Sequence, residues 1–219
     1  MIDLFFEYQA LFVEGLLVTL QLNALVAVFS LAGGSLVGMV RHYGGRAINM
    51  VLGVPIDILR SIPLLVVLIW IFFAAPPLFG VRYMDPFLAA VIGLSLTQGA
   101  YISEIVRGGI QSVRQTQTRA ALALGMTRTQ AVTRVVFPQA FIRMLPPIGS
   151  QIAIGIKDST LASVIAVPEL LRQSQIIIGD SMQPFVILTS LMVFYFIIVM
   201  VVVRLIDMLY SKLSARGAS

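Results

Sequence analysis

Apolar runs long enough to cross a bilayer recur along this chain and leave it little choice of fold. A spanning helix needs about 20 such residues, because hydrocarbon offers no water to satisfy its backbone polar groups. With 58% hydrophobic and only 11% charged residues, the composition is that of a polytopic membrane protein. We therefore expect an all-α integral membrane fold in which residues 1–219 form a single domain. Its five expected transmembrane helices cover roughly residues 15–40, 49–76, 86–106, 145–167 and 185–203.

Residues 1–14 carry three acidic side chains and no lysine or arginine. A secretory signal peptide begins with positive charge, so this end is expected to be retained. Its apolar residues recur at three- and four-residue steps, which predicts an amphipathic segment lying on the membrane surface. These residues are Leu4, Phe5, Tyr8, Leu11 and Phe12.

Lysines and arginines are distributed unevenly between the expected loops. If the N-terminus is outside, the external loops hold only Arg82 and Arg172, whereas the cytosolic segments hold eleven. Cytosolic loops carry the excess of positive charge in membrane proteins, so we expect the N-terminus outside and the C-terminus inside. The eleven are Arg41, Arg46, Arg107, Arg114, Arg119, Arg128, Arg134, Arg143, Arg204, Lys212 and Arg216.

Several classes of function are disfavoured by composition. The net charge of +5 lies in short loops between apolar spans, so it indicates orientation rather than nucleic-acid binding. The absence of cysteine excludes disulfides, thiolate metal sites and cysteine nucleophiles. The single histidine, His42, falls in an expected loop, where a solvated side chain is favoured over a metal or catalytic site.

Polar side chains inside the expected spans are candidate solute-binding groups, because such groups are costly in hydrocarbon. In the second span, Asp57 and Arg60 are three residues apart and share a helix face, where they can neutralise each other. Ser61 follows, and then Pro63, which removes a backbone donor and interrupts the helix. The third span carries a polar stripe at three-residue spacing, formed by Gln98, Tyr101 and Glu104.

Four consecutive polar residues interrupt the fourth span: Lys157, Asp158, Ser159 and Thr160. They cannot all face one side of a helix, so we expect a local unwinding, as in the broken helices with which transporters hold polar solutes. A structural interpretation stays open, in which these groups pair with each other or with a second subunit and hold helices together. Glu104 can likewise extend to the cytosolic interface, where Arg107 lies one turn further along.

The longest polar interruption, residues 119–140, lies on the expected cytosolic side. The alanines and leucines before Gly125 favour a short helix, and Gly125 suits the left-handed residue that ends it. Thr127 can then cap a second helix over residues 128–136, and Pro138 predicts a break after it. A loop that only orients the protein is the simpler interpretation of the arginines here.

This segment resembles the cytosolic signature of the permease subunits of ABC importers for polar amino acids, of the histidine, glutamine and glutamate permease type. That signature reads Glu-Ala-Ala, three residues, Gly, nine residues, then Ile-x-Leu-Pro. It is matched here at Ala120, Ala121, Gly125, Val135, Phe137 and Pro138. The resemblance covers most of the chain and includes residues 60–64, 100–101 with Glu104, 108–112, 157–161 and 168–170.

The resemblance implies a type I ABC importer permease fold, with a cytosolic coupling-helix loop at about residues 108–143. The residues that would meet the ATPase are Arg119, Ala120, Ala121, Leu124 and Gly125. The substrate-binding set would be Arg60, Ser61, Gln98, Tyr101, Glu104, Lys157, Asp158, Ser159 and Thr160.

Partners also follow from the resemblance: a second permease subunit, identical or related, a dimer of cytosolic ABC ATPases and an extracytoplasmic solute-binding protein. The expected location is the bacterial cytoplasmic (inner) membrane. The chain contains no phosphate-binding loop, so we expect ATP and Mg²⁺ to be bound by the partner ATPase and no cofactor or metal by this chain.

Arg119 departs from the family pattern, because it stands where the signature has its first Glu. Near the start of a helix this reversal of charge is mildly unfavourable. Docking through the small Ala120–Ala121 face is expected to persist, whereas the ion pair formed by the Glu is not.

The expected function is therefore a transport subunit, not an enzyme, that imports polar amino acids. A zwitterion fits cations such as Arg60 and Lys157 together with the intramembrane carboxylates, and the sequence of residues 60–63 leans toward glutamate or aspartate. A secondary amino acid transporter driven by an ion gradient is the main alternative, although no internal repeat is evident. An intramembrane enzyme and a purely structural subunit are further alternatives.

Overall fold

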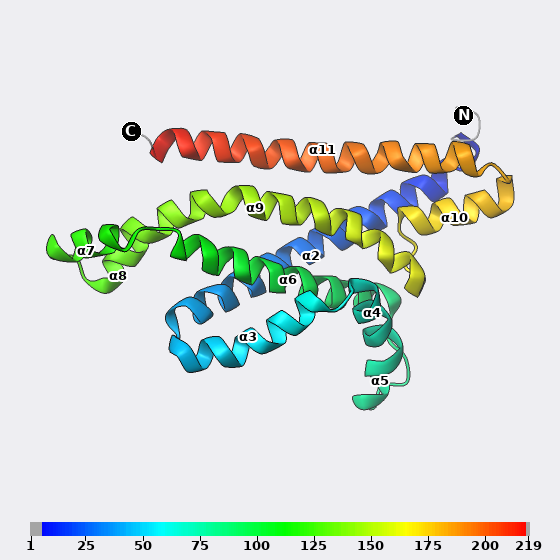
Figure 1. The fold of residues 1–219 in the computed structure, drawn as a ribbon. Helices are drawn as coiled ribbons and strands as arrows, with labels where there is room; N and C mark the ends of the chain where they lie inside the picture. The colour runs from blue at the N-terminus through cyan, green and yellow to red at the C-terminus, as the bar shows by residue number, and fades with distance from the viewer. Residues whose placement is uncertain (1–5, 218–219) are drawn as a thin grey trace.

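The computed structural model describes residues 6–217, which form helices and turns and contain no strand. Four long helices are α2 (Gln9–Tyr43), α6 (Pro86–Gln111), α9 (Phe137–Asp158) and α11 (Pro184–Gly217). Helix α6 packs between α2 and α9, and α11 lies along the outer side of α9 (Figure 1). The expected all-α class is confirmed.

Among the described residues, three helices are long and apolar enough to cross a membrane: α2, α6 and residues Pro184–Ala215 of α11. Two bent helix pairs raise the number of candidate spans to five. The five expected spans therefore correspond to three continuous helices and two broken ones.

Helix α2 is longer than the first expected span at both ends. The surface segment expected at the N-terminus is wrong for its described part, because Phe12 is 3% exposed and packs with Leu170 and Ile177; Leu4 and Phe5 lie outside the described residues. At the other end, Arg41 and His42 belong to the last turn of α2 and not to a loop. The hydropathy pattern underestimated the length of the helix, because tertiary contacts of Arg41 stabilise its charged C-terminal end.

Close approach of α2 to α6 requires two glycines. A Cβ atom added to Gly34 would lie 2.6 Å from the Gly99 carbonyl oxygen, and one added to Gly38 would lie 2.5 Å from the Ser103 oxygen. Small residues at a helix crossing in a membrane allow backbones to pack by direct contact. Substitution at either position would force the two helices apart.

The second expected span is broken at the place where Pro63 predicts it. Helix α3 (Gly45–Ser61) ends at an extended Ile62, and α4 (Leu64–Ile69), the π turn η1 (Trp70–Ala74) and α5 (Ala75–Leu78) follow. The two halves are bent by 104°. This pair is therefore a sharply bent element and not a straight crossing.

The fourth expected span begins far earlier than expected. After α7 (Gln115–Ala123), the short α8 (Arg128–Ala131), the π turn η2 (Val132–Val136) and α9 form one continuous helical run. The break expected at Pro138 is wrong. Pro138 lies in the first turn of α9, directly after η2, where its missing N–H group is tolerated.

The unwinding expected at the polar quartet of the fourth span is wrong, because the four residues stay helical and only the type of helix changes. Helix α9 ends at Asp158 and continues as the more tightly wound 3₁₀ helix η3 (Ser159–Ile165). Ala166 then takes a left-handed conformation with φ of 65°, and α10 (Leu170–Ser181) leaves at 53° to the preceding run. A seven-residue 3₁₀ helix is unusually long, so this break is a distinct feature of the fold.

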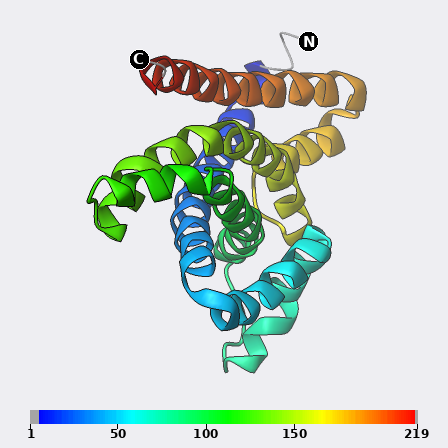
Figure 2. The ribbon, with the colours of Figure 1, turned by 60° about the vertical axis from the view of Figure 1, so that its left-hand side comes forward.

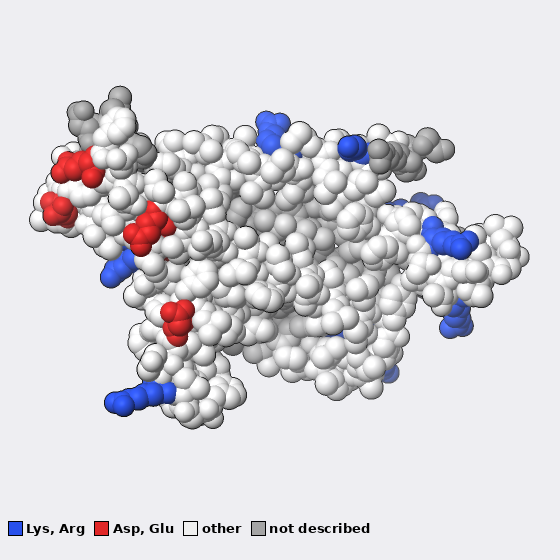
Figure 3. Space-filling model, turned by 180° about the vertical axis from the view of Figure 1, so that it is seen from behind, with Lys and Arg blue, Asp and Glu red and all other residues white. Residues whose placement is uncertain are grey.

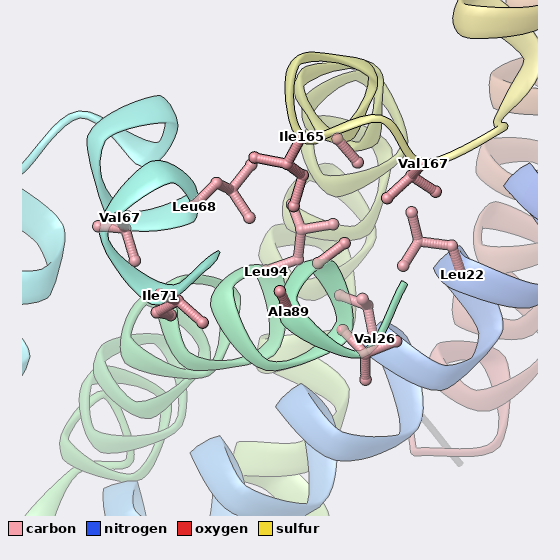
Figure 4. Close-up of a cluster of buried hydrophobic side chains, with 12 residues drawn as sticks. Leu22, Val26, Val67, Leu68, Ile71, Ala89, Leu94, Ile165 and Val167 are labelled. Atoms are coloured by element: carbon pink, nitrogen blue, oxygen red, sulfur yellow. The ribbon is translucent and has the colours of Figure 1, made fainter. Parts of the chain in front are cut away.

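One apolar cluster joins both broken spans to the continuous helices (Figure 4). Leu68 of α4 and Ile165 of η3 point toward each other over Leu94 of α6, and all three are nearly inaccessible. Leu22 and Val26 extend the cluster to α2. In a membrane, van der Waals packing rather than the hydrophobic effect holds helices together, so the close contacts of these side chains keep the breaks in place.

Candidate functional site

Gln98 of α6 is the meeting point of α6 and α9. Its side chain is 3% exposed, donates to Asp158 Oδ2 at 3.0 Å and accepts a hydrogen bond from Gln151 Nε2 at 2.5 Å. Gly155 faces the same amide. The amide also borders a mostly apolar cavity of about 220 Å³ between α2, α6, α9 and α11, whose polar lining includes Asn23. Two members of the expected substrate-binding set, Gln98 and Asp158, are thus brought into direct contact.

Arg60 and Tyr101 form a second contact between expected site residues. The guanidinium lies 5.3 Å from the ring centroid of Tyr101, whose hydroxyl donates to the Arg60 carbonyl at 3.2 Å. Arg60 also pairs with Asp57 at 3.5 Å, as their spacing predicts. Ser61 donates to the Asp57 carbonyl at 2.7 Å. The broken end of α3 is therefore held on α6 with a partly exposed cation beside it.

The four consecutive polar residues point in different directions. Ser159 is fully buried and accepts a hydrogen bond from Asn23 of α2 at 3.0 Å. Asp158 turns to Gln98, whereas Lys157 is exposed and forms no ion pair within the described chain. Thr160 donates to the Lys157 carbonyl at 2.7 Å. At the change from α9 to η3, the adjacent residues Asp158 and Ser159 thus contact α6 and α2 respectively.

Glu104 lies apart from these contacts, near the end of α6. Its carboxylate pairs with Arg41, which is 7% exposed, and with Arg107 at 2.7 Å. Arg41 also donates to Asn49 Oδ1 at 3.2 Å, which fixes the turn between α2 and α3. The stripe of Gln98, Tyr101 and Glu104 therefore contacts three different helices, and Glu104 has two cationic partners of its own.

The segment after α6 forms a short helical projection. Helix α7 ends before Gly125, which has φ of +83°, as its position predicts. Thr127 and Gln130 form a capping box at the start of α8, with hydrogen bonds of 3.2 and 2.9 Å. In the views of Figures 1 and 2, α7 and α8 lie at one end of the bundle. Two tight turns thus separate α7 from the helices that it joins.

Exposure differs sharply along α7. Ala121 is 4% exposed and packs inward, whereas Leu124 is 81% exposed, and Arg119 and Ala120 are also on the surface. Arg143 of α9 donates to the Ser112 carbonyl just after α6. That contact ties together the two helices that flank the projection.

Comparison with known proteins identifies the family. The model of binding-protein-dependent transport system inner membrane components matches residues 30–216. The chain belongs to this family. Its members are transport components, so this permease is a multi-pass membrane protein and not an enzyme.

Named relatives of the permease include the glutamine transport system permease protein GlnP of Escherichia coli K12, which is 41% identical over 191 residues and 87% of each chain. The L-cystine transport system permease protein TcyB of Bacillus subtilis is 39% identical over 161 residues, 74% of this chain and 68% of the relative.

Solved structures match over nearly the whole chain. A chain of an amino acid ABC transporter solved with histidines matches with a TM-score of 0.86 at 31% identity. The match covers 94% of this permease and 95% of that chain. The inward-facing MetNI methionine ABC transporter has a TM-score of 0.77 at 19% identity, with coverage of 94% and 97%, and supports the fold alone. The type I ABC importer permease fold is confirmed.

Charge on the permease is segregated (Figure 3). Acidic side chains gather at the end that holds the N-terminal part of α2 and α10, whereas lysines and arginines predominate at the α7–α8 end. This is the asymmetry from which the sequence predicts orientation.

A buried polar cluster that the sequence did not reveal holds the start of α10. The Glu169 carboxylate is inaccessible and accepts hydrogen bonds from the Leu171 and Arg172 N–H groups at 2.9 and 2.7 Å. Tyr195 of α11 donates to the same carboxylate at 2.9 Å, and Thr19 of α2 accepts from Leu170 N–H at 3.0 Å. We call these residues the Glu169 cluster.

Other contacts were missed for a common reason. Asn23, Gln151 and Tyr195 are polar residues within largely apolar helices, and such residues are themselves a signal of a polar partner. Glu169 precedes a helix as an N-cap residue, but its burial arises only from the packing of α2 and α11 around it.

Proposed function

We propose that this chain is the permease subunit of an ATP-driven importer of polar amino acids in the bacterial cytoplasmic membrane, with its N-terminus outside and its C-terminus inside. The observation that carries the proposal is 41% identity to a glutamine permease over 87% of the chain. None of the relatives reported above is named for glutamate or aspartate, so the lean toward those solutes is not confirmed. Glutamine is the first solute to test.

The polar contacts at the helix breaks support a zwitterionic solute. Arg60 carries a partly exposed cation beside Tyr101, and Asp158 carries a carboxylate beside the Gln98 amide. An amino acid presents a carboxylate and an ammonium group, which these two groups complement. In this proposal Ser61 and Lys157 add polar contacts at the same breaks, whereas Ser159 and Glu104 position helices.

In this proposal, ATP hydrolysis is coupled to transport because α7 is connected to the helices α6 and α9, which carry Gln98 and Asp158. The partner ATPases bind ATP and Mg²⁺, and their closure displaces α7. Because α6 and α9 flank this projection and the Arg143–Ser112 contact clamps them, a displacement acts on both helices. The Gln98–Asp158 contact joins the same two helices inside the bundle. Movement at the cytosolic end is thereby transmitted to the solute-binding groups.

The complete importer in this proposal has two permease subunits, two ATPases and an extracytoplasmic binding protein. Its test is ATPase activity in nanodiscs that hold this chain, a candidate ATPase and the binding protein, with single amino acids added in turn. Stimulation by glutamine, together with uptake that resists a protonophore but not ATP depletion, is expected. Uptake that requires only the ion gradient would instead support the secondary transporter.

A further inference from the structure

Helix α3 carries part of the proposed solute site, yet little of its surface is buried. It has 17 residues, all of which the structure describes, and Gly53 and Ile56 are the buried ones. Arg60 lies about two helical turns after Gly53 and on the same face of the helix. Because so few residues of α3 are enclosed, its tilt depends on a small number of specific contacts.

Arg41 of α2 makes the contacts near the start of α3. The side chain is buried, and its guanidinium lies against Gly53, where an added Cβ atom would be 3.1 Å from Nη2. The Nε atom donates to Asn49 Oδ1 of α3 at 3.2 Å, and Nη1 donates to the Glu104 carboxylate of α6. A single side chain of α2 therefore joins α3 to α6.

The far end of α3 is also attached to α6. The Tyr101 hydroxyl donates to the Arg60 carbonyl at 3.2 Å, and the Arg60 guanidinium lies 5.3 Å from the centroid of the Tyr101 ring. Tyr101 and Glu104 are three residues apart, so they share one face of α6. Contacts at both ends of α3 thus converge on this face, and Arg41 provides those at the start.

The buried pair of Arg41 and Glu104 supplies geometry rather than net stability. Desolvation of two charges offsets much of their attraction, so apolar side chains of similar size often hold helices together equally well. A guanidinium, however, presents its donors in a fixed plane, which sets the direction in which each partner lies. Arg107 donates to the same carboxylate at 2.7 Å but belongs to α6 itself, so it joins no second helix.

We propose that Arg41 is a positioning residue for solute binding, because its contacts fix the tilt of α3 on α6 and thereby place the Arg60 guanidinium. Arg41 acts through Asn49 and Glu104 and does not touch the solute. The inference rests on the proposed function, in which Arg60 meets the carboxylate of the amino acid. A lysine in place of Arg41 would keep the charge but lose the planar set of donors.

Paired spin labels measure the position of α3 directly. The chain has no cysteine, so labels can be placed at Leu59→Cys on α3 and Leu96→Cys on α6, which border the same groove. The spin–spin distance in nanodiscs should be narrowly distributed in the parent pair and shifted or broadened by Arg41→Met. Glutamine uptake by unlabelled Arg41→Met, assembled with the ATPase and binding protein in proteoliposomes, should fall about tenfold or more.

Arg107→Met is the matched control, because it removes an arginine from the same carboxylate without releasing another helix. It should change neither the distance nor the uptake. The double variant Arg41→Met/Glu104→Met removes the buried pair as a whole. It should recover the thermal stability that Arg41→Met loses, but neither the parental distance nor the parental uptake.

An unchanged distance in Arg41→Met would overturn the positioning role, and so would a changed distance with parental uptake. Full uptake by the double variant would show that Arg41 only neutralises Glu104. If Arg41→Met does not fold, the double variant decides by the same two measurements. If the parent complex imports no amino acid, the proposed function fails, whereas the distance still shows whether Arg41 positions α3.

Discussion

Two helix N-termini at different places in this permease are treated in opposite ways. At α10, the first three N–H groups donate to the buried side chains of Thr19 and Glu169. The Tyr195 hydroxyl donates a further hydrogen bond to the Glu169 carboxylate. At α7, the N-cap is Arg114, without a side-chain hydrogen bond. The first end is capped by side chains of the chain itself, whereas the second has no side-chain cap. Polar side chains thus fix the α10 end of this molecule more firmly than the α7 end.

The largest effect is expected at the fixed end. Glu169→Ala removes the acceptor of three partly buried donors, and a buried donor costs about 1–3 kcal/mol when it is left unpaired. We expect the free energy of unfolding to fall by about 3 kcal/mol or more, measured as thermal or denaturant unfolding in detergent. Tyr195→Phe should have a smaller effect, because it removes one donor and leaves the two backbone contacts of Glu169. Equal stability of Glu169→Ala and the parent would show that water replaces the carboxylate. The capped N-terminus of α10 would then contribute no more to stability than the uncapped N-terminus of α7.

A second effect is expected between the two ends. Gln98→Leu leaves Asp158 and Gln151 without their hydrogen-bond partner and removes both hydrogen bonds that link α6 to α9 at this point. Since a hydrogen bond to a charged group contributes about 1.5–3 kcal/mol, solute uptake should fall about tenfold or more while the ATPase remains bound. Initial uptake rates in proteoliposomes measure this.

Ser95→Ala is the control for that experiment, because it lies on the same helix and its hydroxyl has no partner within the described residues. Normal uptake by Gln98→Leu would mean that the Gln98–Asp158 contact plays no part in transport.

A smaller effect is expected at the α7–α8 end. Gly125 has space around it, so a substitution there meets no clash and is opposed only by its φ of +83°. Gly125→Val should destabilise the turn by about 1–2 kcal/mol and reduce the stimulation of the ATPase by the loaded permease. Gly125→Asn should retain more stimulation, since Asn tolerates this conformation. If both variants behave alike, the geometry of the turn does not matter for coupling.

The smallest effect concerns an exposed contact near the fixed end. Tyr8 donates to Asp180 Oδ2 at 2.5 Å, and this hydrogen bond raises the pKa of the Tyr8 hydroxyl to about 12. Because the folded pKa lies above the ordinary value of 10.0, the contribution of this contact is fully present below that value and is lost as pH rises through about 12. In an ultraviolet titration, the late step that belongs to Tyr8 should move to lower pH in Asp180→Asn and disappear in Tyr8→Phe.

Local chemistry in the sequence predicted the break at Pro63 and the turn at Gly125 and Thr127, although not the continuous helix through Pro138. Pro63, Gly125 and Thr127 act through their own backbone or side-chain geometry, so their effects can be read without knowing the fold. The pairing of Asp57 with Arg60 is local in the same sense. Such features depend on residues at most four apart.

Contacts between distant segments were not predictable in this way. Arg41 was assigned to a solvated loop because charge normally ends a span, yet its pairing with Glu104, 63 residues away, keeps it buried in α2. The Glu169 cluster likewise joins α2, α10 and α11. The sequence shows that these side chains are polar, but not which of them meet.

The π turn η2 is a place where the helical run before α9 holds one residue more than a regular turn. Each residue added to or removed from a regular α-helix rotates the following side chains by about 100° around the axis, unless a bulge takes up the difference. Gln151 and Asp158, which both contact Gln98, lie after η2 in the same helical run. A change of one residue in the segment before α9 can therefore be absorbed at η2 without turning these two side chains away from α6.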